Sequence, residues 1–170
     1  MVEGPKVTIK AARLSKLKGQ VCRGAGRVLL KDAFDVFNGS HLEDVKAVGK
    51  ELFLLFTGCT HAIRLHFGMS GSERVLSAES AGGAAECNLV PVHSRKLLTA
   101  VLLFEKHSLY LFDTSVTVKA TAYVCRTLQR LHLDVMCEAF SVEAVADLVR
   151  RDARAIHEVL MDQIVLPGNV

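Results

Sequence analysis

Short apolar stretches separated by turn residues fill the chain from residue 20 to about residue 122. A series of short strands with turn signals at intervals is typical of a β-sandwich or a β-barrel. With 170 residues, half of them apolar, the chain is long enough for one domain, or for one domain and part of a second. The pattern therefore predicts a folded β-rich core.

The apolar stretches place the strands as follows. The sequence predicts a strand pair around a turn at residues 24–26, and further strands at 45–56, 62–67, 74–76, 97–104, 108–112 and 115–118. Residues 57–60 read as a turn, 105–107 as the turn of a hairpin, and 78–88 as a loop containing two adjacent glycines.

Helical periodicity occurs at both ends of the chain. Residues 3–18 predict a first helix, in which Pro5 suits the first turn because its missing N–H costs nothing there. After about residue 122 the period becomes helical, with a helix at 123–133, one capped by Ser141, and one at 153–163. The last helix has an apolar face and the sequence ends soon after it, so we interpret the chain as a truncated or alternatively spliced product.

Composition excludes several classes of protein. No apolar run approaches the length of a membrane-spanning helix, and the N-terminus lacks the apolar core of a secretory signal. The five cysteines are scattered and form no CxxC pair, which favours reduced thiols in an intracellular protein. A net charge of +3 permits a nucleic-acid partner without arguing for one, and the absence of tryptophan disfavours a base-stacking platform.

Four short motifs, in this order, carry a resemblance to a known family. They are MVEGP at 1–5, GKELF at 49–53 with IRLHFGMSG at 63–71, LFDTSV at 111–116, and VLMDQ at 159–163 followed by VLPGN at 165–169. Together these segments resemble the Fpg/Nei family of DNA glycosylases, most closely its vertebrate Nei-like protein 3 branch. The resemblance covers nearly the whole chain, although residues 11–48 and 77–100 contribute little to it.

The resemblance implies an α+β fold in two parts. Residues 1–122 correspond to the family's catalytic β-sandwich with its N-terminal helix, and residues 123–170 to the start of a helix-two-turn-helix domain. In the family, DNA lies in the cleft between the two parts. The family's zinc finger would lie beyond residue 170, so we expect this chain to need no cofactor.

The resemblance also implies the catalytic residues Val2, Glu3 and Lys50. Removal of Met1 would expose the α-amine of Val2, whose reference pKa of about 7.7–8.0 leaves a useful neutral fraction for attack on a sugar C1′. Glu3 would move protons between the sugar and the amine, where the start of a helix favours its charge. Lys50 would reach the reacting centre and a neighbouring phosphate; the alternative for Lys50 is a solvated residue at a strand edge.

The implied DNA contacts are Met69, His66, Lys119 and Asn169. Met69 matches the residue that fills the space left by a flipped base, while the alternative is a methionine that fills a gap in the core. His66 alternates with apolar neighbours and would line the core or the cleft. Asn169 matches the family's phosphate-binding asparagine with altered spacing. The family's arginine and aromatic space-fillers are not found in residues 113–119, which favours single-stranded DNA.

Other polar groups read as structural. The remaining histidines have no spacing suited to metal binding, and Asp162 and Gln163 are expected to be polar groups of the last helix. Basic clusters at residues 13–18 and 150–154 could contact phosphates, but charge runs of this kind are more often solvated helix faces.

Three functional hypotheses follow. The first is a monomeric nuclear DNA glycosylase and AP lyase of base-excision repair, acting on oxidised bases in damaged DNA, with no membrane partner. The second is a catalytically inactive truncated product that binds DNA or protein weakly. A chain without the second wall of the cleft would lose phosphate contacts, and these contacts supply most DNA affinity. The third is a generic β-sandwich binding module, in which an added N-terminal residue would change nothing.

Overall fold

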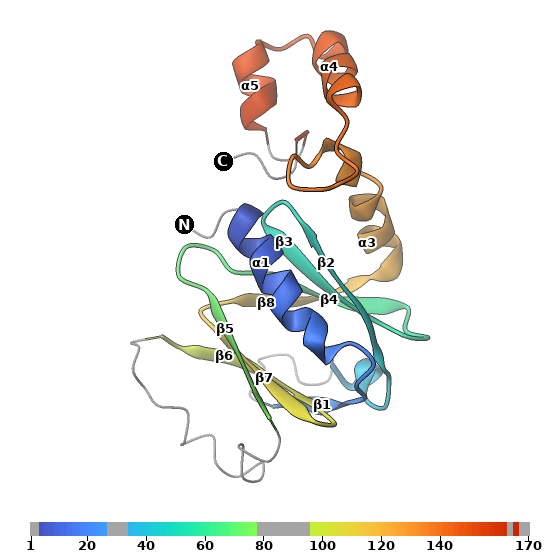
Figure 1. Cartoon of the computed structure of the whole chain (residues 1–170), viewed down its shortest axis with the longest axis vertical. Helices are drawn as coiled ribbons and strands as arrows, with labels where there is room; N and C mark the ends of the chain where they lie inside the picture. Colours follow the sequence, from blue (N-terminus) through green and yellow to red (C-terminus); the bar gives the residue numbers. More distant parts are fainter. Residues whose placement is uncertain (1–3, 27–33, 78–95, 163–164, 167–170) are drawn as a thin grey trace.

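The described residues form two four-stranded antiparallel sheets, with a helix packed on the sandwich and a helical segment at one end (Figure 1). The computed structural model describes residues 4–26, 34–77, 96–162 and 165–166. The expected α+β fold with a β-sandwich is confirmed. No helix in the described part of the chain is long and apolar enough to cross a membrane.

Each sheet is built from strands that are not all consecutive in the chain. The first sheet has the order β1-β6-β7-β5, with β1 at Cys22–Gly26, β6 at Leu98–Phe104, β7 at His107–Phe112 and β5 at Ser72–Ser77. The second has the order β2-β3-β4-β8, with β2 at Leu42–Val48, β3 at Glu51–Phe56, β4 at His61–His66 and β8 at Ser115–Ala120.

The main core lies between the two sheets and under helix α1 (Gly4–Leu14). Alternate residues of the strands point inward, as a half-buried strand requires. Among the fully buried side chains are Leu52, Ile63 and Leu65 of the second sheet, together with Leu102 and Leu109 of the first. Helix α1 adds Val7, Ala11 and Leu14 to this core, and it packs mainly on β2.

A second apolar cluster lies on the outer face of the second sheet. Phe53 and Ala62, which are completely buried, contact Val124 of helix α3 (Thr121–Leu128). Leu55, Leu128 and Leu131 pack around them. Helix α3 therefore covers part of a sheet face that would otherwise expose large apolar side chains.

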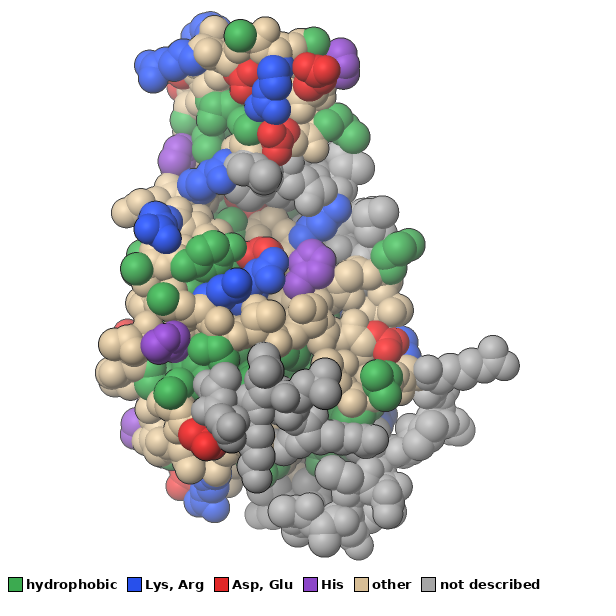
Figure 2. All heavy atoms as spheres, turned by 180° about the vertical axis from the view of Figure 1, so that it is seen from behind, with side chains coloured by type: hydrophobic (Ala, Val, Ile, Leu, Met, Phe, Trp, Pro, Cys, Tyr) green, Lys and Arg blue, Asp and Glu red, His purple; other side chains and the backbone are tan. Residues whose placement is uncertain are grey.

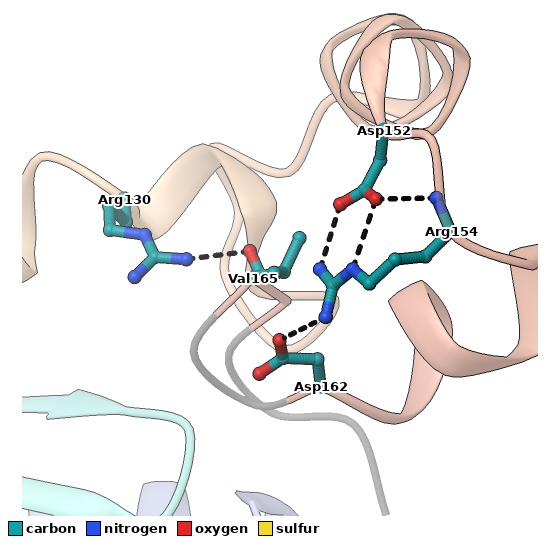
Figure 3. A network of polar contacts seen from close by, with 5 residues as sticks. All are labelled: Arg130, Asp152, Arg154, Asp162 and Val165. Atoms are coloured by element: carbon teal, nitrogen blue, oxygen red, sulfur yellow. Dashed lines mark hydrogen bonds and ion pairs between the residues drawn. The ribbon is translucent and has the colours of Figure 1, made fainter.

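The helical segment continues from α3 through the 3-10 helix η3 (Leu131–Leu133), α4 (Val142–Arg151) and α5 (Ile156–Met161). The predicted cap is confirmed, since the Ala144 N–H donates to the Ser141 hydroxyl at 3.1 Å. Arg154 links the loop between α4 and α5 to the end of α5. Its guanidinium donates two hydrogen bonds to the Asp152 carboxylate, at 2.7 and 3.0 Å, and one to the Asp162 carboxylate at 2.9 Å (Figure 3).

Three sequence predictions about these elements are wrong. Residues 24–26 belong to the single strand β1 and form no turn; the strand is irregular between Cys22 and Gly24, where a glycine accommodates a bulge. The predicted strand at 45–56 is two strands joined by a Gly49–Lys50 turn, because Gly49 adopts a φ of +56°. The last helix begins at Ile156 instead of residue 153.

The other predicted elements are found. The 57–60 turn, the β6–β7 hairpin, and the strands at 62–67, 74–76 and 115–118 match the structure within a few residues. The predicted loop at 78–88 lies outside the described residues. The division of the chain at residue 122 stays a prediction, since β8 ends at Ala120 and α3 starts at the next residue.

Candidate functional site

The outer face of the second sheet is apolar where α3 covers it and polar beside α3. Strand pairing aligns Glu51 of β3 with His66 of β4, and His66 with Ser115 of β8. In the next row, Arg64 of β4 lies opposite Thr117 of β8. Because directly paired residues share a face, these five residues form one surface, here called the polar patch. Figure 2 shows basic, acidic and histidine side chains together at mid-height of the molecule.

Glu51 and Arg64 form an ion pair within the polar patch. Both side chains are 22% exposed, so the pair is partly shielded from water. The hydrogen bond from Arg64 to Glu51 raises the pKa of the Arg64 guanidinium above its ordinary value. The patch therefore contains a fixed positive charge whose partner is a single carboxylate.

Three polar atoms of the patch are buried without a hydrogen-bond partner among the described residues. They are the Arg64 Nε, the His66 Nδ1 and the Thr117 Oγ1. Most buried polar groups in native structures are paired, so three unpaired atoms on two adjacent strands mark an unusual polar surface. Unsatisfied groups of this kind are often found where function requires them.

Lys50 lies in the two-residue turn between β2 and β3, immediately before Glu51. The single strand predicted at 45–56 would have placed Lys50 within a strand, whereas Lys50 lies in a turn between two strands. The strand pairing brings this turn to the same end of the sheet as His66, where β4 finishes. Lys50 and His66 are therefore brought together at one end of the second sheet.

Met69 lies on the turn that follows His66. Its side chain is 75% exposed, so the alternative of a gap-filling core methionine is wrong. The Gly71 N–H donates to the Phe67 carbonyl at 2.7 Å and closes the turn, and the Lys96 ammonium donates to the Ser70 carbonyl at 2.6 Å. Met69 therefore lies on an exposed, hydrogen-bonded turn.

The other predicted site residues are less closely grouped. Lys119 lies opposite Ala62, at the far end of β8 from His66, and its ammonium is 5.5 Å from the centre of the Tyr123 ring. Val2, Glu3 and Asn169 lie outside the described residues. Helix α1, which begins at Gly4, starts at the end of the sandwich that faces the helical segment (Figure 1).

Comparison with known proteins finds similarity to endonuclease 8-like 3 in sequence and to DNA glycosylases in fold. No family model matches it. Endonuclease 8-like 3 of Bos taurus is 31% identical over 167 residues, covering 97% of this chain and 24% of the relative. The Homo sapiens protein of the same name is 28% identical over 186 residues, covering 99% of this chain and 28% of the relative. The chain thus spans about a quarter of the length of these relatives.

Solved structures with the same fold include a viral DNA glycosylase, with a TM-score of 0.74 and 15% identity over 98% of this chain and 66% of that one. They also include the LlFpg protein in complex with a THF-DNA, with a TM-score of 0.70 and 17% identity over 98% of this chain and 62% of that one. In sequence this chain is similar to the endonuclease 8-like 3 proteins, and in fold it is similar to the Fpg structure. The resemblance inferred from the sequence motifs is therefore confirmed.

Several polar residues of this chain were not predicted to belong to the site. Glu51 and Thr117 were missed, as was Arg64, although Arg64 and His66 are spaced by two on a predicted strand and so share a face. Asp134 was also missed. It is 3% exposed and accepts a hydrogen bond from the Gly49 N–H at 2.7 Å.

The basic clusters are largely paired within the described residues. Lys18 pairs with Asp44, and Arg13 lies 3.7 Å from Glu73. Arg150 pairs with Asp147 on its own helix at 3.0 Å. Together with the Arg154 pairs, these contacts favour solvated faces. Asp162 directly follows α5 instead of lying within it and pairs with Arg154, whereas Gln163 lies outside the described residues.

The family's zinc finger has no counterpart in the described part of this chain. Within those residues, no three His, Cys, Asp or Glu side chains are grouped in a way that could hold a metal ion.

Proposed function

We propose that this chain is a DNA glycosylase of base-excision repair that also has AP lyase activity. The observation that carries the proposal is the relationship to endonuclease 8-like 3 over 97% of the chain. The arrangement of Lys50, His66 and Met69 at one end of the second sheet supports it. Lys119 is proposed as a further DNA contact on β8, and Asn169 as a phosphate contact.

The proposed reaction begins at the α-amine of Val2, which becomes available when Met1 is removed. The neutral amine forms a bond to the deoxyribose C1′, the glycosidic C–N bond breaks, and the damaged base leaves with a proton. Opening of the sugar ring gives a Schiff base. Loss of a 2′ proton then drives β-elimination of the 3′ phosphate, which cuts the strand.

Glu3 and Lys50 have separate roles in this proposal. Glu3 supplies and accepts the protons that the ring oxygen and the amine exchange. Lys50 holds a phosphate beside the reacting sugar, since an ammonium on a flexible stem is suited to a point contact of this kind. No metal or organic cofactor is required for any of these steps.

The proposed substrate is oxidised or abasic DNA, with a preference for single strands. Met69 is exposed on its turn and is proposed to enter the space left by the extruded base. The segment 113–119 contains no arginine and no aromatic residue that could help Met69 to fill this space. We expect the protein to bind duplex DNA weakly when the space left by the extruded base is not filled, and the proposal therefore favours single-stranded DNA. We expect a monomer that acts in the nucleus.

Borohydride trapping tests this proposal. Purified protein is incubated with a labelled single-stranded oligonucleotide that contains one abasic site, and the reduced adduct is measured by gel electrophoresis and mass spectrometry. We expect a covalent adduct at Val2, and we expect it to be lost when one residue is added before Val2 and reduced in Glu3→Gln and Lys50→Ala. Asp147→Asn, an exposed change on α4, is the matched control and should leave trapping unchanged.

The inactive alternative predicts a different result. A chain without catalytic activity would form no adduct at any protein concentration, while circular dichroism would still report a folded protein. That outcome would overturn the proposed enzyme and would leave weak DNA or protein binding as the function to examine. An adduct that survives the N-terminal extension would exclude Val2 as the nucleophile.

A further inference from the structure

Asp134 connects the helical segment to the turn that carries Lys50. Its carboxylate is 3% exposed and follows η3 directly. One oxygen, Oδ2, accepts the Gly49 N–H at 2.7 Å in a buried contact between residues 85 positions apart. The other, Oδ1, accepts the Met136 N–H at 3.0 Å. A buried carboxylate is costly unless it is hydrogen bonded, so both N–H groups are specific partners of Asp134.

The Gly49–Lys50 turn depends on this contact for its orientation. The turn has only two residues, and Gly49 adopts a φ of +56°, which favours glycine. The Gly49 N–H points at a side chain of the helical segment. A charged acceptor gives a short and strongly directional bond. The backbone from which the Lys50 side chain extends is thereby fixed relative to η3.

Apolar packing supports the same connection. Val48, which directly precedes the turn, is 3% exposed and belongs to the cluster with Phe53, Ala62 and Val124. Leu131 of η3 packs against that cluster. The segment around Asp134 therefore reaches the turn in a defined position, and the hydrogen bond adds direction to a contact that packing alone would leave free to slide.

We propose that Asp134 is a positioning residue for Lys50. Asp134 touches neither DNA nor the reacting atoms; it holds the turn so that the Lys50 ammonium extends to the phosphate beside the reacting sugar. This inference rests on the proposed function, because Lys50 has a role to be positioned for only if the chain acts on DNA. It makes the chemistry of the sandwich depend on the docking of the helical segment.

A double-mutant cycle between Asp134 and Lys50 tests the inference. The full chain is assayed in a single turnover on an abasic single-stranded oligonucleotide, and the cleavage rate constant is compared for wild type, Asp134→Ala, Lys50→Ala and the double variant. We expect Asp134→Ala to reduce the rate constant by about 100-fold, the order of loss that a small misplacement causes. In the Lys50→Ala background the same change should cost less than about 2-fold, because the group to be positioned is gone.

Further measurements separate positioning from a general loss of structure. Asp134→Asn keeps one acceptor oxygen and should lose an intermediate amount of activity. The DNA concentration needed to saturate the enzyme should not change, and the melting temperature should stay close to that of wild type. Amide hydrogen exchange at Gly49 should accelerate in both Asp134 variants. Asp147→Asn removes an exposed carboxylate of the same helical segment and should match wild type in every measurement.

The outcomes distinguish the two proposals. Equal losses from Asp134→Ala in the wild-type and Lys50→Ala backgrounds would overturn the positioning role and leave the proposed function intact. A wild-type chain that cuts no abasic DNA would overturn the proposed function, and the positioning role with it.

Discussion

Glu51 of β3 and Arg64 of β4 form a partly buried ion pair on the outer face of the second sheet. Arg64 is therefore a positive charge held beside the proposed phosphate contacts, and Glu51 reduces its attraction for a polyanion. The pair is conspicuous because Arg64 Nε, His66 Nδ1 and Thr117 Oγ1, around it, are buried without partners in the described part of the chain. Replacing Glu51 alone by a neutral residue would therefore make the net charge of the polar patch more positive.

Glu51→Gln should strengthen DNA binding. Without the Glu51 carboxylate, the Arg64 guanidinium is free to attract phosphate. The plot of log binding constant against log salt concentration for single-stranded DNA should therefore become steeper by about 0.7. Fluorescence anisotropy at several salt concentrations measures this slope. Glu43→Gln is the matched control, because it makes the same chemical change at an exposed position of β2. Equal slopes for wild type and Glu51→Gln would place the DNA backbone away from this pair.

Met69→Ala should affect activity on duplex DNA much more than stability. The side chain is 75% exposed, so its removal should change the free energy of unfolding by less than about 0.5 kcal/mol. Because only a duplex has a space to fill opposite the orphaned base, excision from duplex DNA should fall by about 10-fold while single-strand cleavage changes little. Parallel rate measurements on the two substrates check this. A similar fall on both would show that Met69 does not act by filling the space.

Gly71→Ala should destabilise the turn that carries Met69. A Cβ at position 71 would lie 2.2 Å from the Phe67 carbonyl oxygen, so the backbone must shift and the Gly71–Phe67 hydrogen bond must weaken. We expect a loss of about 2 kcal/mol, measured by urea unfolding. Gly58→Ala has a φ of +72° but no atom within 4 Å of the added carbon, and it should cost about 1 kcal/mol. A larger loss at Gly58 than at Gly71 would contradict the steric argument.

Asp44 should give the protein a pH-dependent stability in the acid range. Partial burial raises the pKa of Asp44, but bonds from Lys18 and Lys46 and from the Val45 N–H outweigh it and lower the pKa from 3.8 to about 2. Between these values the unfolded chain binds more protons than the folded one, so stability falls as pH falls from about 4 to about 2.

Asp44→Asn tests that sign. The variant should be less stable than wild type by about 1 kcal/mol at pH 7, since the pairs are only partly shielded from water. The difference should shrink as the pH is lowered through the same window and should disappear only below about pH 2, where Asp44 is protonated in the folded protein as well. Urea unfolding at a series of pH values measures it. A difference that stays constant from pH 7 to pH 2 would rule out the carboxylate charge as its source.

The sequence predicted elements that are defined by local pattern. The cap at Ser141, the hairpin turn at 105–106 and helix α1 all follow from residues close together in the chain. The β2–β3 turn was missed because Gly49 and Lys50 stand between two apolar stretches and look like part of one strand. The proposed site residues Lys50, His66 and Met69 were found through motifs, and the structure brings them to one end of a sheet.

Contacts across long sequence distances could not be predicted. Nothing in the residues around Asp134 indicates that its carboxylate accepts a hydrogen bond from Gly49, 85 positions earlier. The Glu51–Arg64 pair likewise depends on the register between β3 and β4. Both contacts arise from tertiary packing, which a single sequence read by local pattern does not contain.

The packing of α3 on the second sheet has a consequence for any attempt to divide the chain. Phe53 and Ala62 are completely buried only because Val124 and its neighbours cover them. A fragment that ends at residue 122 would therefore expose a hydrophobic surface on the two central strands, β3 and β4, and such surfaces promote self-association. Expressed alone, the sandwich should collect in inclusion bodies, and adding α3 and η3 should restore its solubility.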